Sequence, residues 1–151
     1  MAEHPRIDVM VDVVALTEAD GVLQVLVVRR GKPPFEGRWA LPGGYLEIDE
    51  DLAPAAAREL HEETGIELDR DELRQLAAYG EPGRDPRNRT VSVAFLAELT
   101  EGPEARGGSD ADDADWRSVA DLLREDSLAF DHAGILRDGV ASSRWASVLP
   151  R

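Results

Sequence analysis

Hydrophobic and polar residues alternate along the first part of the chain. Ile7, Val9, Val11 and Val13 are separated by Asp or Met, the period-two pattern of a strand with one buried face. VLQVLVVRR at 22–30 predicts a second strand. The polar TEADG between the two strands predicts a hairpin turn.

A proline- and glycine-rich stretch and then a helical pattern follow. GKPPFEGRW at 31–39 predicts an ordered loop, and ALPGG at 40–44 predicts a brief strand and a glycine turn. From about Asp51 to Thr64 the spacing becomes helical, because Asp51 is a good N-cap and Gly65 is a natural stop. At about 100° per residue, one arc of this helix is apolar and the neighbouring arc is acidic. The apolar arc contains Ala53, Ala56, Ala57 and Leu60, and the acidic arc contains Glu59, Glu62 and Glu63.

The second half of the chain predicts two further strands and two helices. The strands are LRQLAAYG at 73–80 and TVSVAFLAEL at 90–99, joined by the polar segment 81–89. Residues 100–115 are rich in Gly, Asp and Glu and predict a mobile loop. WRSVADLL then leads into a short helix, and a final helix is expected at about 131–146. Strands placed between helices predict a single α/β domain over 1–151, an α/β/α sandwich with a mixed β-sheet between helices.

Composition and charge limit the functions to consider. With 17 Lys and Arg against 31 Asp and Glu, the net charge is −14, so we expect no nucleic-acid partner and no membrane partner. No apolar run reaches the roughly 20 residues of a membrane span, and the start lacks the pattern of a secretory signal, so a cytoplasmic location is expected. The absence of cysteine removes thiolate catalysis and Cys-ligated zinc.

The acidic arc is the strongest candidate for chemistry. Glu59, Glu62 and Glu63 stand at i, i+3 and i+4 and emerge close enough to repel one another. Clustered carboxylates suit hard divalent cations, so Mg²⁺ or Mn²⁺ is the expected cofactor. Zinc is disfavoured because His4, His61 and His132 are scattered singly, each more typical of a surface or helix residue than of a ligand. The alternative is a solvated acidic helix face.

The fuller stretch GGYLEIDEDLAPAAARELHEETGI, residues 43–66, resembles the Nudix box, the signature of hydrolases that split a nucleoside diphosphate linked to another group. Every fixed position of the motif is filled, namely Gly44, five residues, Glu50, seven residues, Arg58, Glu59, Leu60, one residue, Glu62, Glu63, one residue, Gly65 and Ile66. Agreement at so many fixed positions makes chance a poor explanation.

The resemblance implies a role for each matched residue. Glu59, Glu62 and Glu63 would bind the metal, and together with Arg58 they form the implied catalytic set. Glu50 would steady Arg58, while Gly44 and Gly65 would shape the loop and end the helix. A further acid often comes from a later loop in this family, and Asp110, Asp112, Asp113 and Asp115 are equal candidates for it, with an ordinary solvated segment as the alternative.

The substrate must be read from residues outside the box. Arg84, Arg87 and Arg89 cluster in GRDPRNR, and an arginine fork suits a terminal phosphate; the alternative is a charged turn that neutralises nearby acids. Arg38 is a candidate neighbour of the phosphates. Aromatic side chains that could stack on adenine are Phe35, Trp39 and Tyr45, with simple packing as the alternative.

RDPR at 84–87, DDADW at 112–116 and LAFDH at 128–132 are similar to the ADP-ribose pyrophosphatase branch of the family. This resemblance implies hydrolysis of ADP-ribose, a small-molecule nucleoside diphosphate, to AMP and ribose 5-phosphate, and it implies a homodimer. Two other hypotheses stay open: a pyrophosphohydrolase that sanitises oxidised nucleoside triphosphates, and a non-catalytic sensor of ADP-ribose or another nucleotide. The metal count also stays open.

Overall fold

One mixed sheet of seven strands organises the computed structural model, which describes residues 4–108 and 111–149. The hydrogen-bonded order is β3-β2-β1-β6-β5, with β4 paired to β1 and β7 paired to β2. The pair β1 and β6 is parallel, and the other pairs are antiparallel. The strands are β1 Asp8–Ala19, β2 Val22–Arg30, β3 Trp39–Ala40, β4 Gly43–Tyr45, β5 Arg74–Tyr79, β6 Thr90–Glu98 and β7 Ala111–Ser118.

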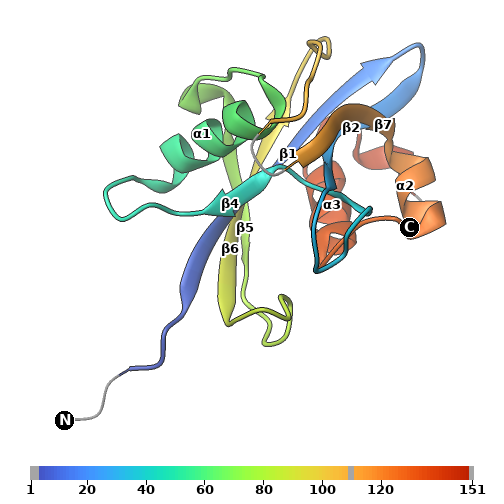
Figure 1. Cartoon of the computed structure of the whole chain (residues 1–151). Helices are drawn as coiled ribbons and strands as arrows, with labels where there is room; N and C mark the ends of the chain where they lie inside the picture. The colour runs from blue at the N-terminus through green and yellow to red at the C-terminus, as the bar shows by residue number, and fades with distance from the viewer. Residues whose placement is uncertain (1–3, 109–110, 150–151) are drawn as a thin grey trace.

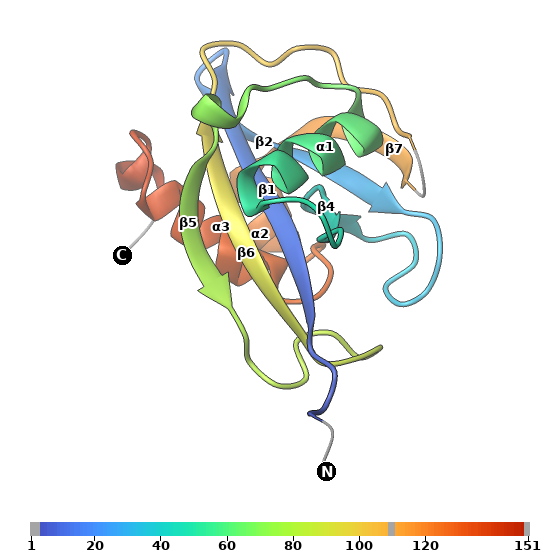
Figure 2. The ribbon, with the colours of Figure 1, turned by 90° about the vertical axis from the view of Figure 1, so that its left-hand side faces the viewer.

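Helices cover both faces of this sheet. Helix α1, Leu52–Thr64, packs on one face, whereas α2, Val119–Glu125, and α3, His132–Ala141, pack on the other (Figures 1 and 2). Two short 3₁₀ turns complete the described elements, η1 Arg70–Glu72 and η2 Ala146–Val148. The predicted α/β/α sandwich with a mixed sheet is therefore confirmed. Within 4–108 and 111–149, no helix is long and apolar enough to cross a membrane.

The central strand β1 is buried on both faces, not on one as its alternation predicted. Val14 and Leu16 join the core beneath α2 and α3, whereas Val11, Val13 and Ala15 join the core beneath α1. The reason is the position of β1 inside a sheet that carries helices on both sides, where strands become apolar on both faces.

The predicted hairpin between the first two strands is confirmed, but its turn is shorter than TEADG. Strand β1 continues to Ala19, which pairs with Val22. Asp20 and Gly21 make the turn, with φ angles of 52° and 78°. Two left-handed residues suit the right-handed twist of the paired strands.

Two expectations about the second half of the chain were wrong. Residues 111–115 belong to β7 and pair with the C-terminal part of β2, residues 27–30, although the Asp-rich composition predicted a mobile loop. Strand pairing with β2 supplies the backbone hydrogen bonds that composition alone does not reveal. The final helix is also shorter than predicted, because α3 ends at Ala141 with the Ser142 N–H bonded to the Asp138 carbonyl at 3.1 Å.

Candidate active site

Helix α1 has the bounds that the sequence predicted, and its caps explain them. The Asp51 side chain accepts a hydrogen bond from the Leu52 N–H at 2.7 Å. Gly65 ends the helix with a φ of 77°, and its N–H donates to the His61 carbonyl at 2.9 Å. Ala55, Ala56, Leu60 and Thr64 are the buried residues, so the apolar arc is centred slightly differently from the predicted one. The small side chains let α1 lie close to the sheet.

The acidic arc of α1 opens into a pocket of about 510 Å³. The lining also includes parts of β1 and β4, the end of β2 and the two residues after it, Ala40 of β3, the loop before β6 and the start of α3. Of the predicted site residues, the pocket brings together Gly44, Arg58, Glu59, Glu62, Glu63, Arg84 and Arg87, and the proposed stacking residue Tyr45 also lines it. Residues that the sequence did not single out, or did not place here, also line it, including Asp12, Arg30, Lys32, Gly43, Phe130 and His132.

Arg58 is the cation among the carboxylates of this arc. Its guanidinium donates to both carboxylate oxygens of Glu50, at 2.9 and 2.5 Å. It also donates to Glu59 at 2.9 Å and to Glu62 at 3.2 Å. The hydrogen bond to Glu50 is the main cause that raises the pKa of Arg58 above its usual range, and it lowers the pKa of Glu50. Repulsion between the glutamates is therefore reduced within the protein itself.

Glu59 is half-buried beside Gly44. Burial raises the pKa of Glu59, and the charge of Glu62 adds to this, whereas the hydrogen bond from Arg58 opposes it. Burial is therefore a larger cause of the raised pKa of Glu59 than repulsion from the neighbouring acids. A Cβ atom at Gly44 would lie 2.5 Å from the Glu59 carboxyl carbon, so a larger residue there would force this carboxylate to move.

Glu63 is oriented by the backbone of β4. The Gly43 N–H donates to its Oε1 at 2.7 Å. A charged hydrogen bond of this length is among the stronger kinds in proteins. Glu59 and Glu63 therefore each contact one of the two consecutive glycines that begin β4.

These residues provide suitable donors for a divalent cation. No group of three or more His, Cys, Asp or Glu side chains within the described ranges is already arranged to hold a metal ion. However, the donors of Glu59, Glu62 and Glu63 are all carboxylate oxygens, which Mg²⁺ and Mn²⁺ prefer. Glu59 is held partly out of water with a raised pKa, and a neighbouring cation would favour its charged form.

Two of the three arginines predicted to bind phosphate, Arg84 and Arg87, are already paired with carboxylates. Arg84 donates to both oxygens of Asp131, at 2.9 and 2.8 Å, and its side chain is only 4% exposed. Arg87 donates to both oxygens of Asp85, at 3.0 and 2.7 Å, and lies over the ring of Phe130. Their contacts match the alternative of a turn that neutralises nearby acids, although both residues still line the pocket.

Arg38 and Trp39 do not line this pocket. The Arg38 guanidinium donates to the carbonyl of Asp126. Trp39 is 9% exposed and packs in the core beneath α2 and α3, with Arg29 and Arg117 near its ring. It borders a separate, smaller pocket of about 320 Å³. Phe35 packs edge-on against Phe130, with 4.8 Å between the ring centroids, and is likewise absent from the lining of the 510 Å³ pocket.

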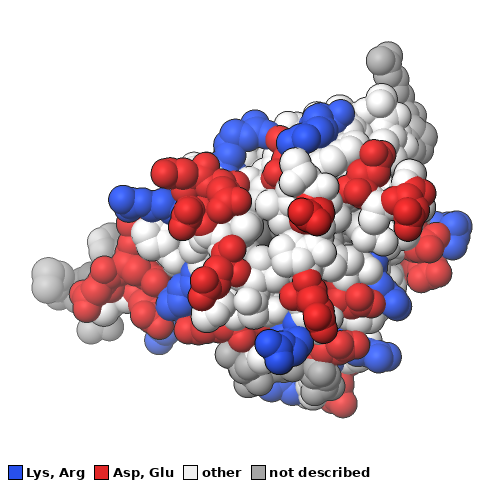
Figure 3. Space-filling view, turned by 90° about the horizontal axis from the view of Figure 1, so that it is seen from above, with Lys and Arg blue, Asp and Glu red and all other residues white. Residues whose placement is uncertain are grey.

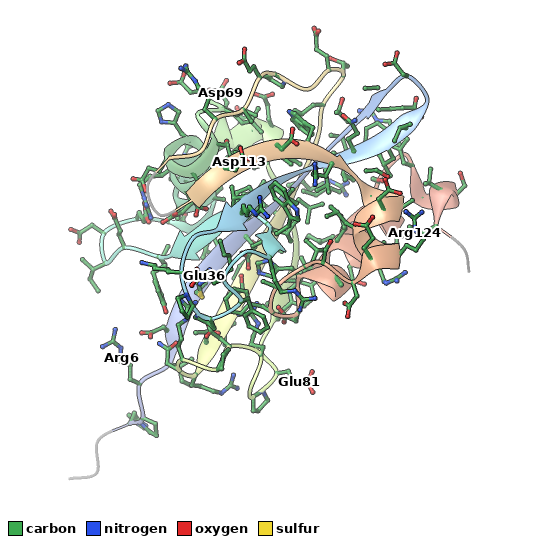
Figure 4. The ribbon with its side chains drawn as sticks, turned by 45° about the vertical axis from the view of Figure 1, so that its right-hand side comes forward. Arg6, Glu36, Asp69, Glu81, Asp113 and Arg124 are labelled. Atoms are coloured by element: carbon green, nitrogen blue, oxygen red, sulfur yellow. The ribbon has the colours of Figure 1, made fainter. Side chains whose placement is uncertain are left out.

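The acids proposed as an additional ligand are distributed differently. Asp113 lies on β7 (Figure 4), where its side chain accepts from the Ala114 N–H, and Asp115 accepts from the Trp116 N–H. Neither lines the pocket. Asp110 and the side chain of Asp112 lie outside the described part of the structure.

A buried polar group that was not predicted from the sequence borders the pocket. Asp12, Ser92 and His132 are all buried. The sequence placed His132 on a surface or helix; it begins α3 but is only 5% exposed. Burial raises the pKa of Asp12 and lowers the pKa of His132. An Asp that interrupts the apolar run VMVDVVAL was the one available signal.

Surface charge agrees with the composition. Acidic side chains cover more of the face seen in Figure 3 than basic ones do. The pocket nevertheless contains Arg30, Lys32, Arg58, Arg84 and Arg87. These basic residues lie close to the acidic arc, in a lining that also holds Asp12, Glu47, Asp85 and the three glutamates.

The fold and the glutamate-bearing helix α1 together define the class of protein to which the chain belongs. Residues 7–139 match the NUDIX domain model, so the chain belongs to the Nudix family of hydrolases, and the resemblance of the sequence is confirmed. Hydrolases of this family generally use divalent metal ions.

Individual relatives make the comparison more specific. The chain is 37% identical over 130 residues to an ADP-ribose pyrophosphatase of Methanocaldococcus jannaschii, covering 83% of this chain and 72% of that protein. It is 32% identical over 142 residues to the ADPR responsive transcriptional repressor NtrR of Acinetobacter baylyi, covering 93% of this chain and 56% of the relative. The chain thus spans little more than half of that repressor.

Two solved structures are similar throughout most of the chain. The NUDIX domain of Shewanella oneidensis NrtR complexed with ADP ribose has a TM-score of 0.81 and 32% identity, covering 89% of this chain and 87% of that one. A bifunctional NMN adenylyltransferase/ADP ribose pyrophosphatase from Francisella tularensis, complexed with AMP and a Mn ion, has a TM-score of 0.77 and 33% identity. That match covers 89% of this chain and 41% of the Francisella chain.

Proposed function

We propose that this protein hydrolyses the diphosphate linkage of ADP-ribose to AMP and ribose 5-phosphate with Mg²⁺ or Mn²⁺. The observation that carries the proposal is the glutamate face of α1, which retains Arg58, Glu59, Glu62 and Glu63 and opens into a pocket of about 510 Å³. The pyrophosphatase relatives and the ADP-ribose-bound neighbour support this substrate.

Glu59, Glu62 and Glu63 would hold the divalent ion, which supplies charge neutralisation on the phosphates and a bound water of lowered pKa. Arg58 contributes by orienting Glu59 and Glu62 through its hydrogen bonds. The Gly43 N–H orients Glu63. In the net reaction, a water oxygen bonds to one phosphorus, and the bond from that phosphorus to the bridging oxygen breaks. The leaving phosphate takes the electron pair, and the proton lost by the attacking water is released to solvent. Because water attacks phosphorus directly, no covalent enzyme intermediate is needed.

The remaining pocket residues suggest how the substrate is oriented. Tyr45 is exposed on the glutamate side and is proposed to stack on adenine. Arg87 is partly exposed and is proposed to contact the substrate, whereas Arg84 is buried and supports the wall through Asp131. Gly44 leaves room for the Glu59 carboxylate beside the substrate, and Glu50 and Gly65 support the helix. Arg38 and Trp39 are outside this set because they lie away from the pocket.

The test is product identification combined with one substitution. Glu63→Gln is expected to lower turnover of ADP-ribose by about 10² or more, because a metal-site carboxylate is lost while the fold is kept. Glu67→Gln is the matched control, since Glu67 is 82% exposed and is not among the pocket residues. Unchanged turnover in Glu63→Gln would remove the proposed role of Glu63. Release of a nucleoside monophosphate and pyrophosphate from oxidised triphosphates, with ADP-ribose untouched, would favour the sanitising activity.

A second candidate function is ADP-ribose sensing without hydrolysis. It is favoured by the similarity to an ADPR responsive transcriptional repressor. Calorimetry with ADP-ribose, paired with a turnover assay in Mg²⁺ and in Mn²⁺, separates the two functions. Tight binding without turnover of any nucleotide in a panel would establish the sensor.

A further inference from the structure

A buried polar group lies against Gly43, one of the two glycines that contact the glutamates. Asp12 comes from β1, Ser92 from β6 and His132 from the start of α3. The Ser92 hydroxyl donates to Asp12 Oδ2 at 2.5 Å, and His132 Nε2 lies 3.6 Å from Asp12 Oδ1. Three elements distant in sequence thus meet at one point on the pocket lining.

The orientation of the His132 ring is set by a backbone contact. The Leu41 N–H donates to His132 Nδ1 at 3.0 Å. Because Nδ1 accepts, the neutral ring must carry its proton on Nε2, the nitrogen that faces Asp12. The ring therefore links Asp12 to the backbone of Leu41.

Residues 41–44 connect this buried group to the glutamates. Behind the segment, His132 holds the Leu41 N–H, and the Gly43 backbone lies so close to the Asp12 carboxylate that a Cβ atom would overlap it. On the pocket side, the Gly43 N–H binds Glu63. Gly44 lies against Glu59. A shift of this segment would move the contacts of both carboxylates.

We propose that His132, backed by Asp12, is a positioning residue that sets the placement of Glu63 and Glu59 through residues 41–44. The inference rests on the proposed function only in taking these carboxylates as the divalent-ion site. Loss of the His132 acceptor leaves the buried Leu41 N–H without a hydrogen-bond acceptor. Residues 41–44 then shift so that this N–H reaches another acceptor. Groups that orient metal ligands typically change metal affinity or activity 10- to 100-fold when removed.

The experiment measures Mn²⁺ affinity by electron paramagnetic resonance without substrate, and kcat and KM with ADP-ribose. His132→Leu is expected to weaken Mn²⁺ binding about tenfold or more and to lower kcat more than it changes KM. His132→Asn is the rescue variant, because its amide oxygen can occupy the place of Nδ1 and accept from Leu41. The Mn²⁺ affinity and kcat of this variant are expected to remain within about threefold of the wild-type values, a smaller change than the tenfold loss expected when an orienting group is removed.

Val140→Ala is the matched control. Val140 is a buried residue of the same helix, so its truncation loosens α3 without touching the Leu41 hydrogen bond. Mn²⁺ affinity that falls equally in Val140→Ala and His132→Leu would overturn the proposal, as would unchanged affinity in His132→Leu. Asp12→Ala is expected to weaken Mn²⁺ binding in the same direction, and unchanged affinity would remove Asp12 from the proposal.

A measurement on the wild type covers the case in which His132→Leu does not fold. Nitrogen-15 NMR of the imidazole is expected to show a protonated Nε2 and an unprotonated Nδ1, and the opposite tautomer would overturn the proposal. Failure of the proposed function looks different: wild type that binds Mn²⁺ through this site but hydrolyses no nucleotide leaves the positioning role intact. Wild type that binds no Mn²⁺ overturns both.

Discussion

Two consecutive glycines illustrate how single residues shape this site. Gly43 offers its N–H to Glu63, and Gly44 leaves the space that the Glu59 carboxylate fills. Neither residue has a positive φ, so their requirement is closeness of approach and not backbone conformation. A methyl group is therefore enough to disturb the glutamates.

Gly44→Ala tests this requirement at the residue scale. The added Cβ would lie 2.5 Å from the Glu59 carboxyl carbon, closer than non-bonded atoms can approach, so the carboxylate must move. We expect Mn²⁺ affinity and ADP-ribose turnover to fall at least about tenfold, as when a group that orients a metal ligand is removed. Calorimetric Mn²⁺ titration and steady-state kinetics measure the two effects.

Gly134→Ala is the control for this change. Gly134 lies in α3, and its Cβ would meet nothing within 4 Å. Alanine there is expected to stabilise the fold by about 0.5–1 kcal/mol and to leave turnover unchanged. If Gly44→Ala behaved like Gly134→Ala, the close packing of Glu59 on Gly44 would have no functional meaning.

At the scale of elements, α1 is tied to the segment that precedes it. Arg58 joins Glu50, the Tyr45 carbonyl, Glu59 and Glu62 through one guanidinium. The link restrains the 46–51 connection between β4 and α1 and holds the acidic arc in one arrangement. It also predicts a pH dependence of stability.

Glu50→Gln tests the link between Glu50 and Arg58. The hydrogen bond from Arg58 lowers the pKa of Glu50 below its ordinary 4.5. Because the folded-state pKa is the lower one, the stabilisation is complete above about pH 4.5 and is lost as pH falls through the folded pKa. The difference in unfolding free energy between wild type and Glu50→Gln should therefore shrink on acidification. Urea unfolding at pH 6 and at lower pH values measures it, and a constant difference would contradict the prediction.

At the scale of the whole molecule, the net charge is −14, and part of the negative charge lies on one face of α1. A divalent ion that binds only the folded protein should stabilise it by mass action, by about 2.7 kcal/mol at 100 times its dissociation constant. Mg²⁺ is therefore expected to raise the melting temperature of the wild type. A Glu59→Gln, Glu62→Gln, Glu63→Gln triple variant should lose the effect.

Matched ionic strength is the necessary control for this measurement. Any salt screens repulsion in so acidic a protein, so the Mg²⁺ samples must be compared with NaCl samples of equal ionic strength. An equal melting shift in the two salts, or an undiminished Mg²⁺ shift in the triple variant, would show that the glutamate face binds no ion.

The chain's local patterns alone were sufficient for the layered fold, the bounds of α1 and the three glutamates on one face. Cap residues act on neighbouring backbone groups, and the helical period alone places Glu59, Glu62 and Glu63 together. The filled Nudix motif likewise identified the family, because all its positions lie within 24 consecutive residues, 43–66.

Only the tertiary structure decided which distant groups meet. Strand β7 forms because β2 offers it a free edge, although its Asp-rich composition resembles a loop. Arg84 pairs with Asp131, 47 positions away, and His132 accepts a hydrogen bond from the N–H of Leu41, 91 positions away. The partner of a charged or polar side chain is chosen by the packing of whole elements, and local sequence spacing does not contain that information.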